Sequence, residues 1–220
     1  MGAEGDILAV ARERLVAEAD GIRAVSEMLD TSFVRAASLI LASDGKLFIG
    51  GSGTSGTVAR RMAHILSVTG TPAVAFSPMD SLHGSSGAIT QTDLVLLISN
   101  GGASDEVIKA AQIVQRRGAK VISLTRSHTT RLARLADLSV AVAVGTRAEL
   151  GGIVATGITI AQSAWGDALA EVLMRGRGYT WRQFMDTHPA GAVGKLEDLP
   201  ADLPLLHVPT AASIISVNHD

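Results

Sequence analysis

Short, continuously apolar runs alternate with amphipathic segments along most of this 220-residue chain. The apolar runs lie at residues 46–51, 73–76, 93–99, 120–125 and 138–144. Runs of this length without polar alternation are typical of strands buried on both faces, and intervening helices allow such strands to pair in parallel. The order therefore predicts an α/β fold, a doubly wound five-stranded parallel sheet flanked by helices, in a single domain.

The amphipathic segments carry apolar stripes with the period of an α-helix. Helices are expected at 7–29, 33–41, 58–68, 104–117, 130–135, 150–174 and 180–186. We expect Thr31 and Ser32 to cap the second of these helices and Ser104 to cap the fourth. Trp165 and Trp181 are expected to be packing anchors rather than ligand platforms.

The distribution of proline suggests where the domain ends. We assign residues 1–195 to one domain, with two N-terminal helices within residues 1–45. Residues 196–220 contain three of the six prolines, which oppose helix formation, and are expected to form a C-terminal tail. This tail is a candidate for an extended arm on a partner subunit.

Composition excludes several classes of function. The chain has no cysteine, so disulfides, thiolate catalysis and cysteine-bound zinc are excluded. Its net charge is −2 and no long basic run occurs, which argues against a nucleic-acid partner. No apolar run approaches the roughly 18 residues of a membrane span, and the N-terminus lacks the pattern of a signal peptide. We therefore expect a cytoplasmic protein without membrane association.

Two glycine- and hydroxyl-rich loops follow predicted strands and precede predicted helices. They read GGSGTSG at residues 50–56 and SNGGASDE at residues 99–106. Ligands of open α/β sheets bind outside the carboxyl ends of the strands, and amides at a helix N-terminus favour an anion. A third loop, GTRAELGG at residues 145–152, follows the last strand.

The first loop formally matches a dinucleotide fingerprint through Gly51, Gly53 and Gly56. However, the next predicted strand does not end in the acidic residue that a ribose requires, and the Gly-Lys-Ser/Thr of a P-loop is absent. Two hydroxyl-rich turns on neighbouring strands instead indicate a site for one phosphate monoester, held without metal. A simple strand-to-helix turn capped by Ser55 is the alternative for the first loop.

Several short motifs resemble the sugar isomerase (SIS) domain family of phosphosugar enzymes and sensors. They are GTSG at 53–56, ISNGGAS at 98–104 and VISLT at 121–125. Within that family, GTP at 70–72, HG at 83–84, GDALA at 166–170 and HPAGAVGK at 188–195 are similar to D-arabinose-5-phosphate isomerases. Longer members add two regulatory CBS modules, and this chain ends where those would begin. The resemblance implies a flavodoxin-like SIS fold and a metal-independent aldose–ketose isomerisation of a sugar phosphate through a cis-enediol intermediate.

The loops and the resemblance together give a set of site residues. Those expected to bind substrate are Ser52, Thr54, Ser55, His83, Ser99, Asn100, Gly101, Gly102 and Ser104, and the resemblance maps the family's phosphate-binding serines onto Ser55, Ser99 and Ser104. The candidate catalytic residues are Glu106, His188, Glu149 and Arg147, of which Glu106, as the base, and His188 match the family's motifs. Glu149 is either a displaced carboxylate base or the cap of the long helix, and Arg147 is either an enediolate partner or a solvated side chain.

Four positions depart from the family pattern. Thr54 stands where the isomerases carry a lysine, Arg147 where they carry a glutamate, and Gly101 where they carry a third serine. A histidine that holds an inhibitory zinc in some members is Ser77 here, so neither a metal nor a cofactor is predicted.

Two rivals to the arabinose-5-phosphate isomerase type stay open. One is a 6-phospho-3-hexuloisomerase-like enzyme, and the other is a non-catalytic phosphosugar sensor. For all of them the expected ligand is a phosphorylated sugar, and the expected assembly is a homodimer or homotetramer with sites near subunit interfaces.

Overall fold

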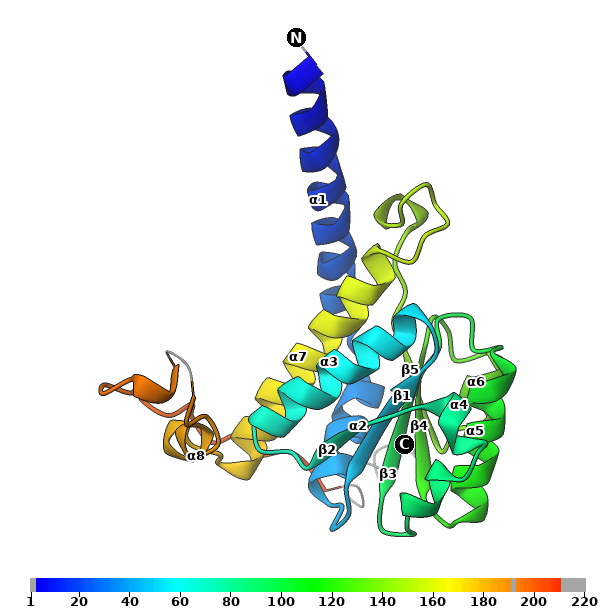
Figure 1. Cartoon of the computed structure of the whole chain (residues 1–220), viewed down its shortest axis with the longest axis vertical. Coiled ribbons are helices and arrows are strands. Elements are labelled where there is room, and N and C mark those ends of the chain that lie inside the picture. The colour runs from blue at the N-terminus through cyan, green and yellow to red at the C-terminus, as the bar shows by residue number, and fades with distance from the viewer. Residues whose placement is uncertain (1–2, 191–192, 211–220) are drawn as a thin grey trace, which may run out of the picture.

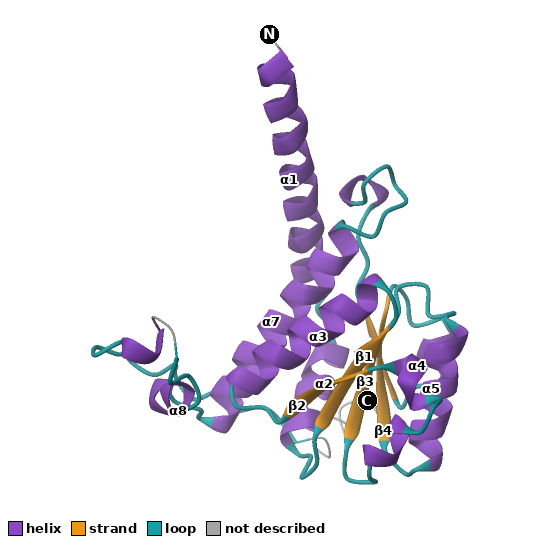
Figure 2. Ribbon diagram, in the orientation of Figure 1, coloured by secondary structure: helices purple, strands orange, loops and turns teal. Residues whose placement is uncertain are grey.

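The structure is a computed structural model that describes residues 3–190 and 193–210. Its five strands form one parallel sheet in the order β2-β1-β3-β4-β5 (Figures 1 and 2). The strands are β1 (Leu47–Gly51), β2 (Ala73–Phe76), β3 (Leu94–Ile98), β4 (Lys120–Thr125) and β5 (Leu138–Ala141). The predicted fold class is confirmed, and the chain order reverses between β1 and β3.

Helices cover both faces of the sheet, as Figure 2 shows. On one face lie α2 (Thr31–Leu41), α3 (Thr54–Val68) and α7 (Gly157–Arg177), and on the other α4 (Pro78–Ser81), α5 (Asp105–Arg116) and α6 (Arg131–Leu135). Alternate residues of the central strands enter separate cores. Leu96 and Ile122 pack with the first group of helices, whereas Val95 and Val121 pack with the second. Shorter elements are η1 (Ser85–Ala88), η2 (Thr146–Ala148) and η3 (Val193–Lys195).

Helix α7 is the central helix of its layer. Trp165 is 1% exposed and meets Phe33 of α2 edge to face at 5.6 Å between ring centroids, which confirms its role as a packing anchor. A Cβ atom on Gly166 would lie 2.8 Å from Cε and 2.9 Å from Cγ of Met62, so any larger residue on α7 would require the Met62 side chain of α3 to move.

Helix α1 (Ala3–Met28) projects from the body of the protein (Figure 1). Only Ala17, Gly21 and Val25 are buried along it, while apolar side chains such as Ile7 and Val10 are each 69% exposed. In the described part of the chain, no helix combines the length and apolar character that crossing a membrane requires.

The C-terminal segment begins with α8 (Trp181–Asp186), at the end of α7 that is farthest from α1's tip (Figure 1). The expected tail then lies along its own chain. Trp181 Nε1 donates to the Ala201 carbonyl at 3.1 Å, and Arg175 Nε donates to the Pro204 carbonyl at 2.9 Å. The tail's last part, residues 211–220, lies outside the described residues.

Three predicted helix starts were wrong by four residues or more. Helix α1 begins at Ala3 instead of residue 7. The long helix begins at Gly157 instead of residue 150, because Gly151 and Gly152 adopt positive φ angles of 63° and 70° in a preceding turn. Helix α3 begins at Thr54 instead of residue 58, with Gly53 at the N-cap. In addition, Asp30 caps α2 in place of Thr31 and Ser32, since its carboxylate accepts the Ser32 N–H at 2.8 Å.

A buried carboxylate joins the amino ends of β1 and β3. Asp93 is 6% exposed and accepts the backbone N–H groups of Lys46 at 2.7 Å and Thr90 at 2.6 Å, together with the Thr90 hydroxyl at 2.8 Å. Burial acts to raise the pKa of Asp93, but these hydrogen bonds and the charge of Lys46 leave that pKa below its ordinary value of 3.8.

We expect Asp93→Asn to lower the free energy of unfolding at neutral pH by about 1–3 kcal/mol, because buried N–H donors lose a charged acceptor. The contribution of a carboxyl with a lowered folded-state pKa is present above the unfolded pKa and is lost as pH falls through the folded pKa. Urea unfolding of both proteins from neutral pH downward should show the difference shrinking below pH 3.8. Asp44→Asn, an exposed neighbour, is the control, and a pH-independent difference would contradict this account.

Candidate functional site

The two hydroxyl-rich loops leave the sheet side by side. Strands β1 and β3 are direct neighbours, with Gly51 opposite Ile98 in the register. A Cβ atom on Gly51 would lie 2.8 Å from the Ser55 carbonyl oxygen and 2.9 Å from the Ile98 carbonyl oxygen, so only glycine allows this contact. The chain turns from β1 into α3 on one face and from β3 into α5 on the other. The loops therefore flank the switch point at which open α/β sheets bind ligands.

The serine hydroxyls of these loops have no protein partner among the described residues. Ser52 and Ser55 lie in the first loop, and Ser99 and Ser104 in the second; none of their Oγ atoms makes a hydrogen bond within the described chain. Ser99 is only 6% exposed. Since buried or half-buried hydroxyls normally find partners, this set is available to a ligand. We call residues 51–55 and 99–104 the hydroxyl cradle.

Two helix N-termini supply further donors to the cradle. Helix α3 begins at Thr54 after Gly53, which has a φ of 57° and carries no side-chain cap. Helix α5 begins after Ser104, whose backbone occupies the N-cap position while its hydroxyl makes no capping bond. Ser104 therefore occupies the expected N-cap position without a hydroxyl cap, and the alternative of a turn capped by Ser55 is not observed. Uncapped N–H groups and the helix dipoles favour an anion between the two loops.

The two glycines of the second loop have different constraints. Gly102 has a φ of 60°, and a Cβ atom there would lie 2.4 Å from Thr130 Oγ1. Its backbone also accepts the Leu132 N–H and donates to the Ser99 carbonyl, both at 3.0 Å. Gly101 has ordinary backbone angles and open space around its Cα, so a side chain would fit at that position.

Glu106 lies in the first turn of α5, next to the cradle. Its side chain is half-buried and makes no hydrogen bond or ion pair with any described residue. The neighbouring Asp105, in contrast, is exposed and pairs with Arg131 at 3.0 Å. Glu106 is thus the carboxylate of this turn that has no partner among the described residues.

A cavity of about 230 Å³ lies at the carboxyl ends of β3, β4 and β5. Asn100 of the cradle, Arg126 after β4, and Thr146 and Glu149 after β5 are its polar lining, and apolar side chains such as Ile153 form the rest. The cavity extends the cradle along the same edge of the sheet.

Glu149 lines this cavity but its carboxylate caps α7. One oxygen accepts the N–H groups of Thr156 at 2.8 Å and Gly157 at 3.0 Å, and the other accepts the N–H of Ile158 at 3.3 Å. Residues 150–156 form a loop that folds back, so the Glu149 carboxylate reaches the N-terminus of α7 although Glu149 is not part of that helix. Between the two roles expected for Glu149, the observed contacts are those of a cap.

Arg147 and His83 lie away from the cavity lining. Arg147 lines a groove of about 520 Å³ beside α1, and its carbonyl accepts a hydrogen bond from Arg14 Nη2 at 2.5 Å. His83 is exposed in the turn between α4 and η1, and its side chain makes no hydrogen bond to a described residue. In the described part of the chain, neither side chain contacts the hydroxyl cradle.

His188 lies at the far end of the molecule from the cavity. Ile158 of α7 lines the cavity, while α8 follows the opposite end of α7, and a 21-residue helix is about 30 Å long (Figure 1). His188 stacks on Phe184 at 4.0 Å between ring centroids, and its Nδ1 lies 2.7 Å from the Phe184 carbonyl oxygen. Its Nε2 is left without a partner among the described residues. In one copy of the chain, His188 does not reach the cradle.

Two arginines near the site were missed by sequence reasoning. Arg126 follows β4 directly, at the same sheet edge as the cradle, and its side chain lines the cavity. The Nη1 atom of Arg60 lies 3.8 Å from where a Cβ on Gly56 would be, which places this cation over the first turn of α3. The usable signals were the strand-end position of Arg126 and the four-residue spacing of Arg60 from Gly56.

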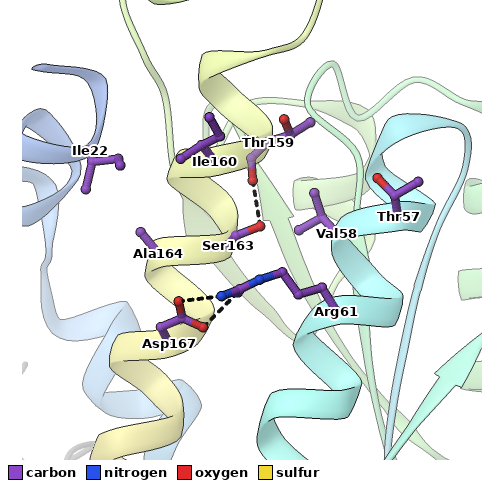
Figure 3. A pocket seen from close by; sticks show the side chains of 9 residues that line it. All are labelled: Ile22, Thr57, Val58, Arg61, Thr159, Ile160, Ser163, Ala164 and Asp167. Atoms are coloured by element: carbon purple, nitrogen blue, oxygen red, sulfur yellow. Dashed lines mark hydrogen bonds and ion pairs between the residues drawn. The ribbon is translucent and has the colours of Figure 1, made fainter. Parts of the chain in front are cut away.

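A second hollow, of about 500 Å³, lies between α3 and α7 and is drawn in Figure 3. Arg61 crosses it to Asp167 with two hydrogen bonds of 2.8 and 2.9 Å, which raise the pKa of Arg61 above its ordinary value. Its polar groups are thus paired already. It runs along the two helices from their first turns, and none of the residues predicted for the site lines it.

The chain is similar to a known family model, to curated proteins and to solved structures. The family model "SIS domain" matches residues 40–172. Arabinose 5-phosphate isomerase KdsD of Pseudomonas aeruginosa is 33% identical over 190 residues, and that of Escherichia coli K12 is 32% identical. Each alignment covers 86% of this chain, which spans only 58% of the length of these relatives. The solved structure of Escherichia coli CFT073 c3406 in complex with arabinose 5-phosphate has a TM-score of 0.82 and 28% identity, covering 86% of this chain and all of that one. On these findings, the chain belongs to the SIS domain family.

Proposed function

We propose that this protein is a metal-independent sugar-phosphate isomerase of the arabinose-5-phosphate type. The observation that carries the proposal is the hydroxyl cradle, whose four serine hydroxyls lack protein partners at a switch point beside a free carboxylate, Glu106, within the described chain. Serine hydroxyls and helix N-termini suit a phosphate monoester, and the adjoining cavity of about 230 Å³ has room for the carbon chain. Residues 1–195 form the sugar-phosphate-binding unit in this proposal.

The reaction moves one proton between two neighbouring carbons. Glu106 removes the proton from C2 of the open-chain aldose, and the C–H electron pair forms the C1–C2 double bond of a cis-enediolate while the carbonyl oxygen gains negative charge. Transfer of the O2 proton to O1 and return of the carbon-bound proton from Glu106 to C1 give the ketose. General-base catalysis of this kind supplies about 10²–10⁴-fold. We assign the base to Glu106 because the Glu149 carboxylate is engaged by three N–H groups of α7.

The relatives support this choice of substrate class. Curated proteins named arabinose 5-phosphate isomerase align over 86% of this chain, and a structural neighbour was solved with arabinose 5-phosphate bound. One observation favours a non-catalytic phosphosugar sensor instead, namely that Thr54 contributes no charge to the cradle and Arg147 lies outside it. Chemical turnover separates these two functions.

Glu106→Gln should abolish exchange of the substrate's C–H proton with solvent while leaving binding of the phosphate ester within about threefold, because only the base is removed. Proton NMR in D₂O with a panel of aldose and ketose phosphates, including hexulose phosphates, measures exchange, and calorimetry measures binding. Asp105→Asn, one residue away on the exposed side, is the control and should remain active. A wild-type protein that exchanges no proton with any sugar phosphate would refute the isomerase proposal.

Ser99→Ala should raise KM about tenfold or more with a smaller change in kcat, because a hydroxyl bonded to phosphate contributes to ground-state binding.

Gly101→Ser should lower KM, since open space and ordinary backbone angles at this position admit one additional hydroxyl beside the cradle. Gly87→Ser, another open glycine but in η1, is the matched control. Steady-state kinetics across the panel of sugar phosphates measures these effects. If neither Ser99→Ala nor Gly101→Ser altered KM, the proposal that the hydroxyl cradle binds the phosphate would be wrong.

We further propose that His188 of a second copy completes each site, because the length of α7 separates His188 from the cradle of its own chain. Inactive Glu106→Gln and inactive His188→Gln proteins, unfolded together and refolded, should then regain activity. Random pairing in a two-fold dimer would restore about one quarter of the wild-type rate, since half the dimers are mixed and each has one intact site. Two separately refolded variants form the control. Failure of a mixed dimer, isolated with two affinity tags, to turn over substrate would rule out this shared site.

A further inference from the structure

Arg126 is fixed to the cradle through its backbone. It is the first residue after β4, and its N–H donates to the Asn100 carbonyl at 3.0 Å. Asn100 belongs to the hydroxyl cradle and lines the cavity together with the Arg126 side chain. The position of this guanidinium stem is therefore set by the same loop that carries Ser99.

The guanidinium of Arg126 is chemically available. It forms no ion pair or side-chain hydrogen bond with any residue that the structure describes. Glu149, the acid of the cavity lining, is bound to the N-terminus of α7. The remaining polar lining, Asn100 and Thr146, is neutral, so Arg126 is the positive charge of the cavity as described.

The strand order gives the position of Arg126 along a bound substrate. Neighbouring strands are about 4.8 Å apart, so a phosphate centred between β1 and β3 lies about 7 Å from the line of β4. That distance is comparable with the length of an open pentose chain. The phosphate end of the ligand would face the cradle and Arg60, and the carbonyl end would face Arg126.

We propose that Arg126 is a catalytic residue that donates hydrogen bonds to the enediolate oxygens at the carbonyl end of the sugar. The inference rests on the isomerase function proposed above. When Glu106 takes the C2 proton, the electron pair shifts to C1–C2 and the carbonyl oxygen becomes an oxyanion. The Arg126 guanidinium stabilises that charge without giving up a proton, and it needs no additional reactant. A fixed donor of this kind typically supplies about 10²–10³-fold in rate.

The test compares four variants at three arginines by proton exchange in D₂O and by steady-state kinetics. Arg126→Gln should reduce kcat about 10²–10³-fold with less than a threefold change in KM, and Arg126→Lys should recover part of the loss. Arg60→Gln, at the phosphate end, should instead raise KM. Arg134→Gln removes an exposed arginine of α6 and should have no effect.

A binding measurement provides the second readout. A phosphorylated aldonohydroxamate mimics the planar, charged enediolate, whereas the matching phosphorylated alditol retains only the phosphate and hydroxyls. Arg126→Gln should lose about 100-fold in affinity for the hydroxamate and little for the alditol. Equal losses for the two ligands, or an unchanged kcat in an active enzyme, would overturn the Arg126 assignment alone. Wild-type protein without any exchange would overturn the isomerase function itself and the enediolate role with it.

Discussion

The parallel pairing of β1 with β3 determines where this protein can do chemistry. These strands are separated in sequence by β2 and its following helices, yet they are hydrogen-bonded neighbours from Leu47–Leu94 to Gly51–Ile98. Because their crossovers leave toward opposite faces, the two loops open away from each other and leave space between them. Asp93 holds the amino ends of the same two strands, and Gly51 allows their carboxyl ends to approach without side chains. The hydroxyls, helix N-termini and Glu106 all derive their positions from this pair.

The strand pattern and the cradle could be predicted from sequence because both depend on local signals. Continuous apolar runs identified β2 and β4 to the residue, and glycine-rich turns after β1 and β3 marked the ligand edge. The start of α7 could not be predicted in this way. Apolar residues at 150–156 resemble a helix, but the carboxylate of Glu149 caps α7 from across that loop, which is a tertiary contact. The side on which Arg147 lies depends on the same turn and on the packing of α1.

The missed arginines show a different limit. Arg126 belongs to a strand end whose following turn, residues 127–130, contains hydroxyl side chains but no glycine, so a search for glycine-rich turns passes over it, although β4 ends beside the cradle. His188 is the opposite case, since its motif is recognisable in sequence but α7 places it at the far end of the molecule. Sequence motifs thus identified chemical groups, while the sheet order and one helix length determined which of them can meet.

The two tryptophans of the chain occupy very different surroundings, and this gives the protein two separate optical reporters. Trp165 is 1% exposed between α7 and α2, whereas Trp181 lies on α8 and bonds to the Ala201 carbonyl of the C-terminal segment. Fluorescence from Trp165 should be shifted to shorter wavelength and protected from soluble quenchers, and emission from Trp181 should respond to them. Detachment of α8 from the rest of the protein should therefore change the emission of Trp181 while the emission of Trp165 still reports a folded core. No added label is needed.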